Sequence, residues 1–243
     1  VRMDVANNTA EHIAPMRPPC QDGVIISDGN LFWGPWMCGC QLSLYGHISL
    51  TAAGNQLASP GEARPQFEPG KGDLKNVRPL AAQKNDWSVY QGNNRRTSTT
   101  ALVLPAALKE RWEFLAPTAV LPTAPVTAGG MTFIANRSGV LRAFNSNGKV
   151  MWKTYTGGAI YFPPAVANGR VYTGSADGRV YCHAVATRRN LWSYRVAPTE
   201  RWIAVLGKLI STWPVAGGVL VENGTVYAPA GIAQYEGSHG VAA

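Results

Sequence analysis

The sequence has few charged residues, few cysteines and no long apolar run. Asp, Glu, Lys and Arg together make up 15% of its 243 residues, which disfavours a fold built from long helices with charged outer faces. No apolar run approaches the roughly 18 residues of a membrane-spanning helix, so no such span is predicted. The Cys-x-x-Cys-His pattern is also missing, which excludes a covalently attached c-type haem.

Glycine and proline, by contrast, are plentiful. The chain has 26 Gly and 17 Pro, a composition typical of many short strands joined by turns. The least strand-like pieces are LPAALKERWEF from Leu104 and the stretch from Ser59 to Pro79. A chain of this length can bury a sizeable core in one large domain or in two small ones.

Basic residues outnumber acidic residues, but they are scattered along the chain. The 22 Lys and Arg and 14 Asp and Glu give a net charge of +8, and only Arg95-Arg96 and Arg188-Arg189 are adjacent pairs. A nucleic-acid surface concentrates basic residues in a stripe among aromatic ones, so no nucleic-acid partner is predicted. The chain begins at Val1 without an initiator Met, which indicates a processed protein, a fragment or a sequence without its true start.

A repeat of about 40 residues organises the second half of the chain. Trp112, Trp152 and Trp192 are separated by 40 and 40 residues, a period typical of stacked structural repeats. The text before each Trp also matches, as in GGMTFIANRSGVLRAFNSNGKVMW and NGRVYTGSADGRVYCHAVATRRNLW. Each unit predicts a strand, a turn with a glycine of positive φ, a second strand, a polar turn and an outer strand that carries the Trp.

The same template occurs at both ends of the chain. GGVLVENGTVYAPAG from Gly217 matches DGVIISDGNLFWGPW from Asp22 at an offset of 195 residues, which is five units of 39. Repeated four-stranded antiparallel units of this period predict an all-β fold, a β-propeller whose blades pack face to face. Three parts are expected: a blade-like segment with a Cys cluster at 1–58, a linker or loop at 59–86, and propeller repeats at 87–243.

The repeat count is low for a closed ring. About four units are recognisable, with irregular insertions, whereas closed propellers typically have about four to eight blades of about 40 to 50 residues. The expectation is therefore an incomplete ring or a piece of a larger propeller of about eight blades. Self-association of two partial rings is the alternative way to cover exposed edges.

These Trp-ended units resemble the pyrroloquinoline-quinone (PQQ) propeller repeat family, whose outer strand ends in Ala-x-Asp-x-x-Thr-Gly-Lys-x-x-Trp. One unit follows this pattern with one residue deleted, through Ala143, Asn145, Gly148, Lys149 and Trp152. The other follows it at full length through Thr187 and Trp192, with Cys182, Ala184 and Arg188 in place of Ala, Asp and Gly. The resemblance implies that Trp112, Trp152 and Trp192 dock neighbouring blades, and Ala143 and Gly148 are further candidates for blade docking.

Two further segments are similar to this family. DWSVYQGNNRRTS, Asp86 to Ser98, looks like the opening before the first blade, and CQDGVIISDGNLFWGPWMCGCQLSLYG looks like a subgroup of large secreted bacterial members. The family includes quinoprotein dehydrogenases, which oxidise alcohols or sugars with PQQ and Ca²⁺, and a non-enzymatic lipoprotein of outer-membrane assembly. Fold analogy does not choose between these activities.

The cysteines have two interpretations. Since relatives are exported, a disulfide from Cys20 to Cys38 or Cys40 is the first, because an oxidising compartment preserves disulfides. A metal or redox site made by Cys38, Cys40 and His47 is the second, although the spacing departs from the usual Cys-x-x-Cys. Cys182 is expected to be a buried thiol beneath the blade Trp.

Catalytic residues are not identifiable from the sequence. A quinoprotein dehydrogenase needs a carboxylate base and an oxygen-rich Ca²⁺ site, yet the 14 acidic residues form no tight pair in a recognisable motif. Asp177 and Glu222 stand beside turn glycines, where turn geometry alone explains them.

Long connections offer binding candidates instead. The segment Ala197–Val215 stretches the distance from Gly169 to Gly224 to 55 residues. Its Arg and Trp residues suit an anionic, planar or sugar-like partner, but they equally suit an edge cover whose Trp residues are core. The candidate ligand-binding residues are Trp36, Tyr45, Tyr161, Arg201, Trp202, Lys208 and Trp213.

The combined expectation is an exported, periplasmic or secreted, PQQ-repeat propeller that serves as a binding platform or as part of a quinoprotein. One alternative is a PQQ- and Ca²⁺-dependent alcohol or sugar dehydrogenase, and another is a protein-assembly scaffold without cofactor. The partners would be a small alcohol or sugar, a protein or glycan on the loop face, or further propeller blades and subunits. Whether the protein is an enzyme is left open.

Overall fold

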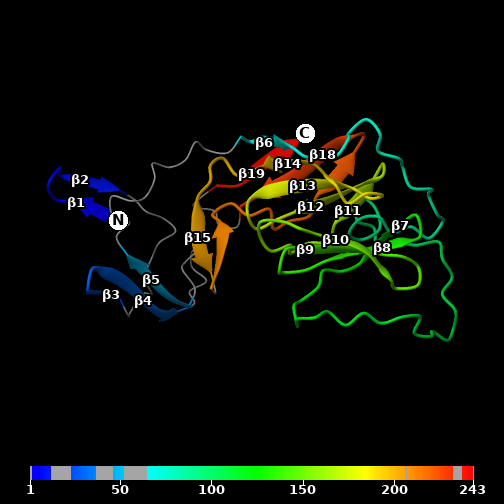
Figure 1. Cartoon of the computed structure of the whole chain (residues 1–243), viewed down its shortest axis with the longest axis horizontal. Coiled ribbons are helices and arrows are strands. Elements are labelled where there is room, and N and C mark those ends of the chain that lie inside the picture. Colours follow the sequence, from blue (N-terminus) through cyan, green and yellow to red (C-terminus); the bar gives the residue numbers. More distant parts are fainter. Residues whose placement is uncertain are drawn as a thin grey trace.

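The computed structural model describes residues 2–11, 23–36, 46–51, 65–205, 207–231 and 237–242, and these residues form strands and turns without a helix. Most strands gather into antiparallel sheets that lie side by side (Figure 1). The prediction of an all-β propeller fold is confirmed. Within the described ranges, no helix has the length and apolar character that a bilayer crossing requires.

The first blade is the sheet whose last strand carries Trp152. Its strands are β7 (Val126–Ala128), β8 (Met131–Ala135), β9 (Val140–Phe144) and β10 (Val150–Tyr155), paired in sequence order. Gly139 turns the chain between β8 and β9 with a φ of 74°, a conformation that favours glycine. The Asn145 Oδ1 accepts hydrogen bonds from the backbone N of Asn147 and Lys149, each at 3.0 Å, so Asn145 shapes the polar turn before β10.

The second blade repeats this arrangement 39 to 40 residues later and gains a fifth strand. It consists of β11 (Ala165–Ala167), β12 (Arg170–Gly174), β13 (Arg179–Ala184) and β14 (Asn190–Arg195), followed by β6 (Phe67–Pro69). β6 pairs antiparallel with β14 at the outer edge, so that Ser193 faces Glu68. The range 59–86, expected to be a linker or loop, therefore contains a strand that covers the edge of a blade.

The third sheet has three strands among the described residues, and a separate hairpin precedes it. The sheet comprises β17 (Leu220–Glu222), β18 (Thr225–Ala230) and β19 (His239–Ala242), and the hairpin comprises β15 (Trp202–Val205) and β16 (Lys208–Ser211). The hairpin lies within the segment that interrupts the repeat period, and it forms a sheet of its own. Figure 1 shows it at one end of the blades.

The N-terminal part contains a second three-stranded sheet. It is formed by β3 (Val24–Ser27), β4 (Asn30–Trp36) and β5 (Gly46–Thr51), and β1 (Arg2–Asp4) and β2 (Thr9–Glu11) form a separate short hairpin. Ile25 pairs with Phe32, as Leu220 pairs with Tyr227 in the third sheet. The match at an offset of 195 residues therefore extends to strand register.

The core lies between the blades. One apolar cluster joins the facing surfaces of the first and second blades, with Phe133, Trp152 and Val171 among its members. A larger cluster joins the second blade to the third sheet, including Val180, Leu191 and Val226. Face-to-face burial of this kind is what holds the neighbouring blades of a propeller together.

Candidate functional site

The connections at one end of the blades form a continuous surface, which we call the loop face. It is made of the β10–β11 connection (156–164), the β12–β13 turn (175–178) and the β14–β17 connection (196–219). The Ala176 backbone N donates to Ala159 O at 2.8 Å, and the Ser211 N donates to Ala176 O at 2.7 Å. Segments from two blades and the inserted hairpin are thereby hydrogen-bonded to one another.

Apolar packing fixes the β15–β16 hairpin on this face. Ile203 and Ile210 are buried against Ala159 and Ala176 in a small cluster of their own. Side chains alternate along a strand, so Trp202, beside Ile203, points away from that cluster and is 39% exposed. The hairpin is therefore an anchored platform with an exposed aromatic residue.

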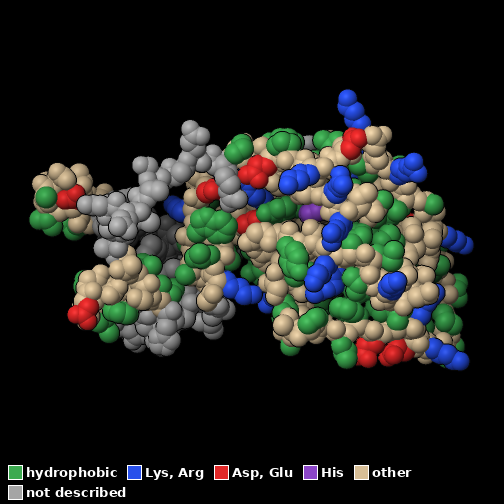
Figure 2. All heavy atoms as spheres, in the orientation of Figure 1, with side chains coloured by type: hydrophobic (Ala, Val, Ile, Leu, Met, Phe, Trp, Pro, Cys, Tyr) green, Lys and Arg blue, Asp and Glu red, His purple; other side chains and the backbone are tan. Residues whose placement is uncertain are grey.

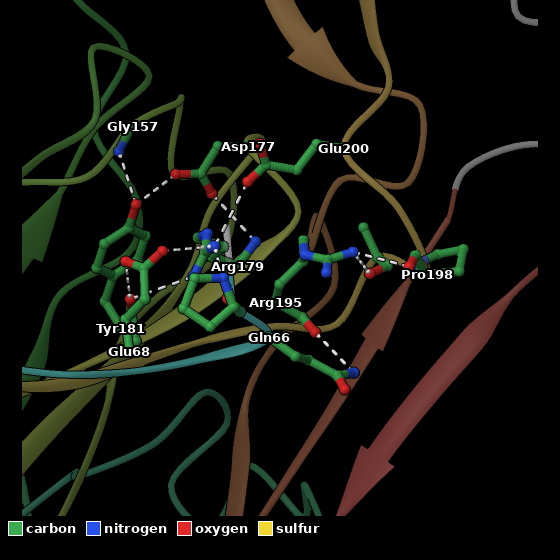
Figure 3. A network of polar contacts seen from close by, with 12 residues as sticks. Gln66, Glu68, Gly157, Asp177, Arg179, Tyr181, Arg195, Pro198 and Glu200 are labelled. Carbon is green, nitrogen blue, oxygen red and sulfur yellow. Dashed lines mark hydrogen bonds and ion pairs between the residues drawn. The ribbon is translucent and has the colours of Figure 1, made fainter. Parts of the chain in front are cut away.

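A buried arginine lies where β13, β6 and the β14–β15 connection meet (Figure 3). The Arg179 side chain on β13 is only 2% exposed, and its Nη2 lies 2.9 Å from Glu68 Oε1 and 3.4 Å from Glu200 Oε1. It also donates to Ser193 Oγ and to Pro65 O. A buried guanidinium requires such partners, so Arg179 ties β6 and the β14–β15 connection to the blade.

The Asp177 carboxylate is occupied by structural bonds. It accepts a hydrogen bond of 2.5 Å from the Tyr181 hydroxyl and one of 3.1 Å from the Arg179 backbone N. Figure 3 shows the Tyr181 oxygen between Asp177 and Gly157, whose backbone N donates to it at 3.2 Å. Burial raises the pKa of the Asp177 carboxyl group, and the hydrogen bond from Tyr181 partly offsets this rise. Asp177 therefore occupies the turn position expected from the sequence. Through Tyr181 and Gly157 it also contributes to a contact between the first two blades.

Two pairs of cations and rings lie on the loop face. The Arg201 guanidinium lies 4.7 Å from the centre of the Trp213 ring, and the Arg137 guanidinium lies 5.7 Å from that of Tyr161. Lys208 Nζ donates to Arg137 O at 3.2 Å, which connects the hairpin with the Tyr161 side. Trp213 is buried in the core beneath Arg201.

The candidate residues thus differ in their placement. Tyr161, Arg201, Trp202 and Lys208 are at least partly exposed on the loop face, whereas Trp213 supports it from below. Trp36 belongs to β4, far along the chain from this face. Tyr45 lies outside the described residues.

Sequence reasoning missed a segment that crosses the first strands of three sheets. Trp87 and Thr127 of β7 exchange backbone hydrogen bonds of 2.9 Å, and the Val166 N of β11 donates to Ser88 O at 2.8 Å. Asn94 Nδ2 then donates to the carbonyl O of Val221 in β17 at 2.8 Å. The only signal for this arrangement was the motif that begins at Asp86, which identified an opening segment but not its position.

An arginine at the end of this segment lies beside an apolar cavity. The Arg96 guanidinium is 5.7 Å from the Tyr90 ring centre and 5.5 Å from that of Phe162. The adjacent cavity of about 650 Å³ is lined by Arg96, Phe162 and apolar residues of the third sheet. A cation next to a pair of aromatic rings at the mouth of an apolar cavity suits an anionic group with an apolar body.

The repeat tryptophans have different environments. Trp152 is 9% exposed, and its Nε1 donates to Val185 O of the second blade at 2.8 Å. Trp112 stacks on Phe144 at 5.5 Å and lies over Gly148, where a Cβ would stand 2.6 Å from the ring. Trp192 is half-buried, 6.0 Å from the Tyr172 ring. Trp112 therefore contacts the turn between β9 and β10 of the first blade, and Trp152 contacts the corresponding turn between β13 and β14 of the second blade.

Cys182 lies opposite Trp192 across β13 and β14, as Ala143 lies opposite Trp152. Its thiol is free and fully buried, and burial raises its pKa to about 12. A thiol in this state is a packing group rather than a nucleophile. Cys20, Cys38 and Cys40 lie outside the described residues, so the disulfide and the Cys-Gly-Cys metal site stay predictions.

The described residues do not fit the Ca²⁺ site of a quinoprotein. No group of three His, Cys, Asp or Glu side chains in the described part of the chain is arranged to hold a metal ion, and Ca²⁺ takes six to eight oxygen ligands. The carboxylates on and beside the loop face, Glu68, Asp177 and Glu200, are engaged by Arg179 and Tyr181. No reaction step through a quinone is therefore derived.

Comparison with known proteins identifies the family. The family model described as outer membrane protein assembly factor BamB matches residues 96–229, more than half of the chain. The chain belongs to this family of PQQ-type repeats. A protein of that name from Burkholderia pseudomallei (strain K96243) is 34% identical over 67 residues, which are 28% of this chain and 18% of the relative. The chain thus spans only a small part of that relative.

Solved propellers are similar at low identity. BamB from Moraxella catarrhalis is 22% identical with a TM-score of 0.41, over 54% of this chain and 36% of that one. The quinohemoprotein alcohol dehydrogenase from Comamonas testosteroni is 17% identical with a TM-score of 0.44, over 66% and 25% respectively. A europium-containing methanol dehydrogenase is 14% identical with a TM-score of 0.49, over 61% and 28%.

Proposed function

We propose that this PQQ-repeat module is a non-enzymatic binding platform that holds a protein partner on its loop face. The observation that carries the proposal is the β15–β16 hairpin, which is anchored by Ile203 and Ile210 yet leaves Trp202 exposed. Leu209, on the same hairpin, is 65% exposed. An exposed Trp with an apolar neighbour on a rigid support is typical of the residues that dominate protein interfaces.

Basic residues around the hairpin favour a partner with acidic groups. Arg201 directly precedes Trp202 at the start of β15, Lys208 directly precedes Leu209 on β16, and the chain carries a net charge of +8. Figure 2 shows Lys and Arg side chains dispersed among hydrophobic ones on the visible face of the blades. Such a mixed surface supports protein recognition, in which charge sets orientation and on-rate.

The family description suggests the biological setting. The matched model and the Burkholderia relative are both named for outer membrane protein assembly. We propose that this chain acts in the same setting, exported to the cell envelope, as a scaffold that holds assembly components. The cysteines of the N-terminal segment would then meet an oxidising compartment.

Site-specific photo-crosslinking in cells tests the platform. A photoreactive amino acid in place of Trp202 is expected to form an adduct with an envelope protein, identifiable by mass spectrometry. The matched control replaces Lys149, which lies in the turn between β9 and β10 at the other end of the blades. Adducts of equal yield and identity at both positions would refute a partner site on the loop face.

A PQQ-dependent dehydrogenase is the second candidate, and the observation that favours it is Arg96, which lies next to two aromatic rings beside an apolar cavity. A planar anionic quinone could use such a cation and rings. Titration of the full chain with micromolar PQQ and Ca²⁺, followed by absorbance and dye-coupled alcohol oxidation, tests this candidate. Absence of cofactor uptake would eliminate it and leave the platform proposal unaffected.

A further inference from the structure

A cavity of about 650 Å³, which we call the distal cavity, lies at the end of the blades opposite the loop face. Its walls come from residues 73–78 after β6, from Gly169 in the β11–β12 turn, and from residues 184–189 between β13 and β14. Figure 1 shows the chain after β6, in cyan, running along the blades away from the β15–β16 hairpin. The second blade, which supplies two of the three walls, is covered by the first blade on one side and by the third sheet on the other. The distal cavity is therefore not an uncovered blade face.

Hydrogen bonds fix the walls of the distal cavity. The Gly72 N donates to Asn190 O at 2.9 Å, where β14 begins. The Arg170 Nη2 of β12 donates to Leu74 O at 3.2 Å. The segment 73–78 is thereby held against the second blade, so the cavity is already formed in the free chain, as in most small-molecule sites.

Two arginines line the distal cavity. Arg78 belongs to the segment after β6, and Arg189 belongs to the β13–β14 connection. Both residues are exposed, and in the described part of the chain neither guanidinium has an ion pair, a hydrogen bond or a ring contact. Each guanidinium is therefore available to an anion that enters the cavity.

The fold also gathers further positive charge around this cavity from two segments that are far apart in the sequence. The basic residues of segments 71–78 and 186–189 are Lys71, Lys75, Arg78, Arg188 and Arg189. Asp73 is the single acidic residue in these segments. Its carboxylate accepts hydrogen bonds from Lys75 N at 2.8 Å and from Asn76 Nδ2 at 2.5 Å, so it shapes a turn. The surroundings of the cavity thus favour an anionic ligand.

The other wall residues add a hydroxyl group and an apolar surface. Val77, Ala184 and Ala186 are apolar. Thr187 Oγ1 accepts a hydrogen bond from the Arg189 N at 3.5 Å, which leaves its own proton free to be donated. The distal cavity therefore combines donors for an anionic group with a surface that suits a carbon body.

We propose that the distal cavity binds a phosphate ester with a short apolar body, and that Arg78 and Arg189 hold the phosphate. A carboxylate is satisfied by the two parallel hydrogen bonds of a single guanidinium, whereas a phosphate monoester presents three oxygens and up to two negative charges. Two guanidinium groups and the Thr187 hydroxyl match the phosphate better. A soluble phosphate ester and a phosphorylated lipid headgroup share this chemistry.

Titration calorimetry of the full chain with hexyl phosphate tests the site. Binding of one equivalent is expected, and inorganic phosphate should bind at least about tenfold more weakly because it buries no carbon body. Arg78→Gln and Arg189→Gln should each weaken the binding of hexyl phosphate at least about tenfold, since each removes charge-assisted hydrogen bonds. Arg111→Gln, at an exposed position outside the blades, changes the net charge equally and should leave binding unchanged.

A substitution of opposite sign separates a built site from attraction to the net charge. Asp73→Asn removes the one carboxylate that lines the cavity and keeps an acceptor for the Lys75 N, so binding should strengthen about two- to fivefold. Glu110→Gln, at an exposed position, is the matched control and should not strengthen it. Circular dichroism spectra of all variants must match that of the unaltered chain. No uptake of hexyl phosphate by the unaltered chain, or equal effects in the variants and their controls, would overturn the proposal.

Vesicle flotation distinguishes the two sources of the phosphate. The vesicles are made of phosphatidylcholine with and without phosphatidic acid. Binding to phosphatidic acid that is lost in both arginine variants would identify a lipid headgroup, and uptake of hexyl phosphate without vesicle binding would identify a soluble ester; either result supports the site. Vesicle binding that both variants retain, without uptake of hexyl phosphate, would reflect net charge alone, and the proposal would be wrong. These results do not depend on the partner proposed for the loop face.

Discussion

At the scale of single residues, the repeat tryptophans show how one sequence pattern yields unequal environments. Trp152 is covered by the second blade and satisfies its indole N–H with Val185 O, whereas Trp192 is half-buried next to Tyr172 and Phe67. The 40-residue spacing predicts a Trp on each outer strand, but it does not predict what covers each ring. What covers each ring depends on the neighbouring sheet, which the spacing of the Trp residues does not specify.

Replacement of Trp152 should strongly destabilise the protein. Trp152→Ala removes a buried ring between the blades and is expected to lower the free energy of unfolding by about 3–5 kcal/mol, measured by urea denaturation. Trp152→Phe keeps an aromatic ring but loses the hydrogen bond to Val185, for a cost of about 1–3 kcal/mol. Met151→Ala, at the exposed neighbouring position, serves as control, and an equal loss there would contradict a docking role for Trp152.

A buried histidine should make stability depend on pH. His183 is 2% exposed, its Nε2 lies 3.3 Å from Thr154 Oγ1, and its Nδ1 has no hydrogen-bond partner among the residues that the structure describes. Burial lowers its pKa from 6.5 to about 4. The unfolded chain therefore binds a proton that the folded chain rejects, and stability is lost as the pH falls from 6.5 towards about 4.

The loss of stability has an expected size, and two variants test whether His183 causes it. The shift corresponds to about 3 kcal/mol of unfolding free energy, and urea denaturation across this pH range should reveal it. Asp177 acts in the opposite direction, because its raised pKa makes the folded chain bind a proton more readily. In an Asp177→Asn background the loss should therefore steepen, and His183→Gln should flatten it. An unchanged pH profile in His183→Gln would assign the effect to other groups.

At the scale of elements, turns and strands are predictable where local chemistry specifies them. Gly139, Gly178 and Gly224 lie in turns at positive φ, as their sequence context predicts. β6 was not predictable, because Phe67–Pro69 has no strand signal among its Gly and Pro neighbours. It becomes a strand only through pairing with β14 and through the ion pair of Glu68 with Arg179.

Arg179 should control whether β6 stays attached. Arg179→Met removes the partner of Glu68 and Glu200 while keeping an apolar side chain of similar length, so β6 should detach more often. Hydrogen exchange is expected to accelerate at Glu68 and Arg195, near the β6–β14 pairing, while the β8–β9 pairing stays protected. Lys153→Met on β10 is the matched control, and an equal acceleration there would indicate a general effect of charge.

At the scale of the whole molecule, the repeat period was sufficient to predict the propeller fold. It could not predict the segment 87–98, because this segment obeys no repeat and its contacts with β7, β11 and β17 span 40 to 127 residues. The candidate site could likewise be predicted only in part from the sequence. The insertion identified the loop face, but only the folded chain distinguishes the buried Trp213 from the exposed Trp202.

The long-range contacts of this segment should hold a cleaved chain together. Residues 99–121 form no strand and contain Lys109 and Arg111, both exposed, so limited trypsin digestion should cut there first. The two fragments should co-elute in size-exclusion chromatography, because residues 67–69 and 87–98 remain hydrogen-bonded to the blades. Separation of the fragments without denaturant would contradict this arrangement.

The segment 87–98 also limits how such a protein can evolve. Repeat proteins ordinarily gain or lose a unit by duplication or deletion of a stretch of gene, because each unit contacts only its neighbours. Here a single stretch touches the first strands of three successive sheets. Insertion of one further blade between β7 and β17 would move its hydrogen-bonding partners out of reach, so a change in blade number would require a matching change in the length of this segment.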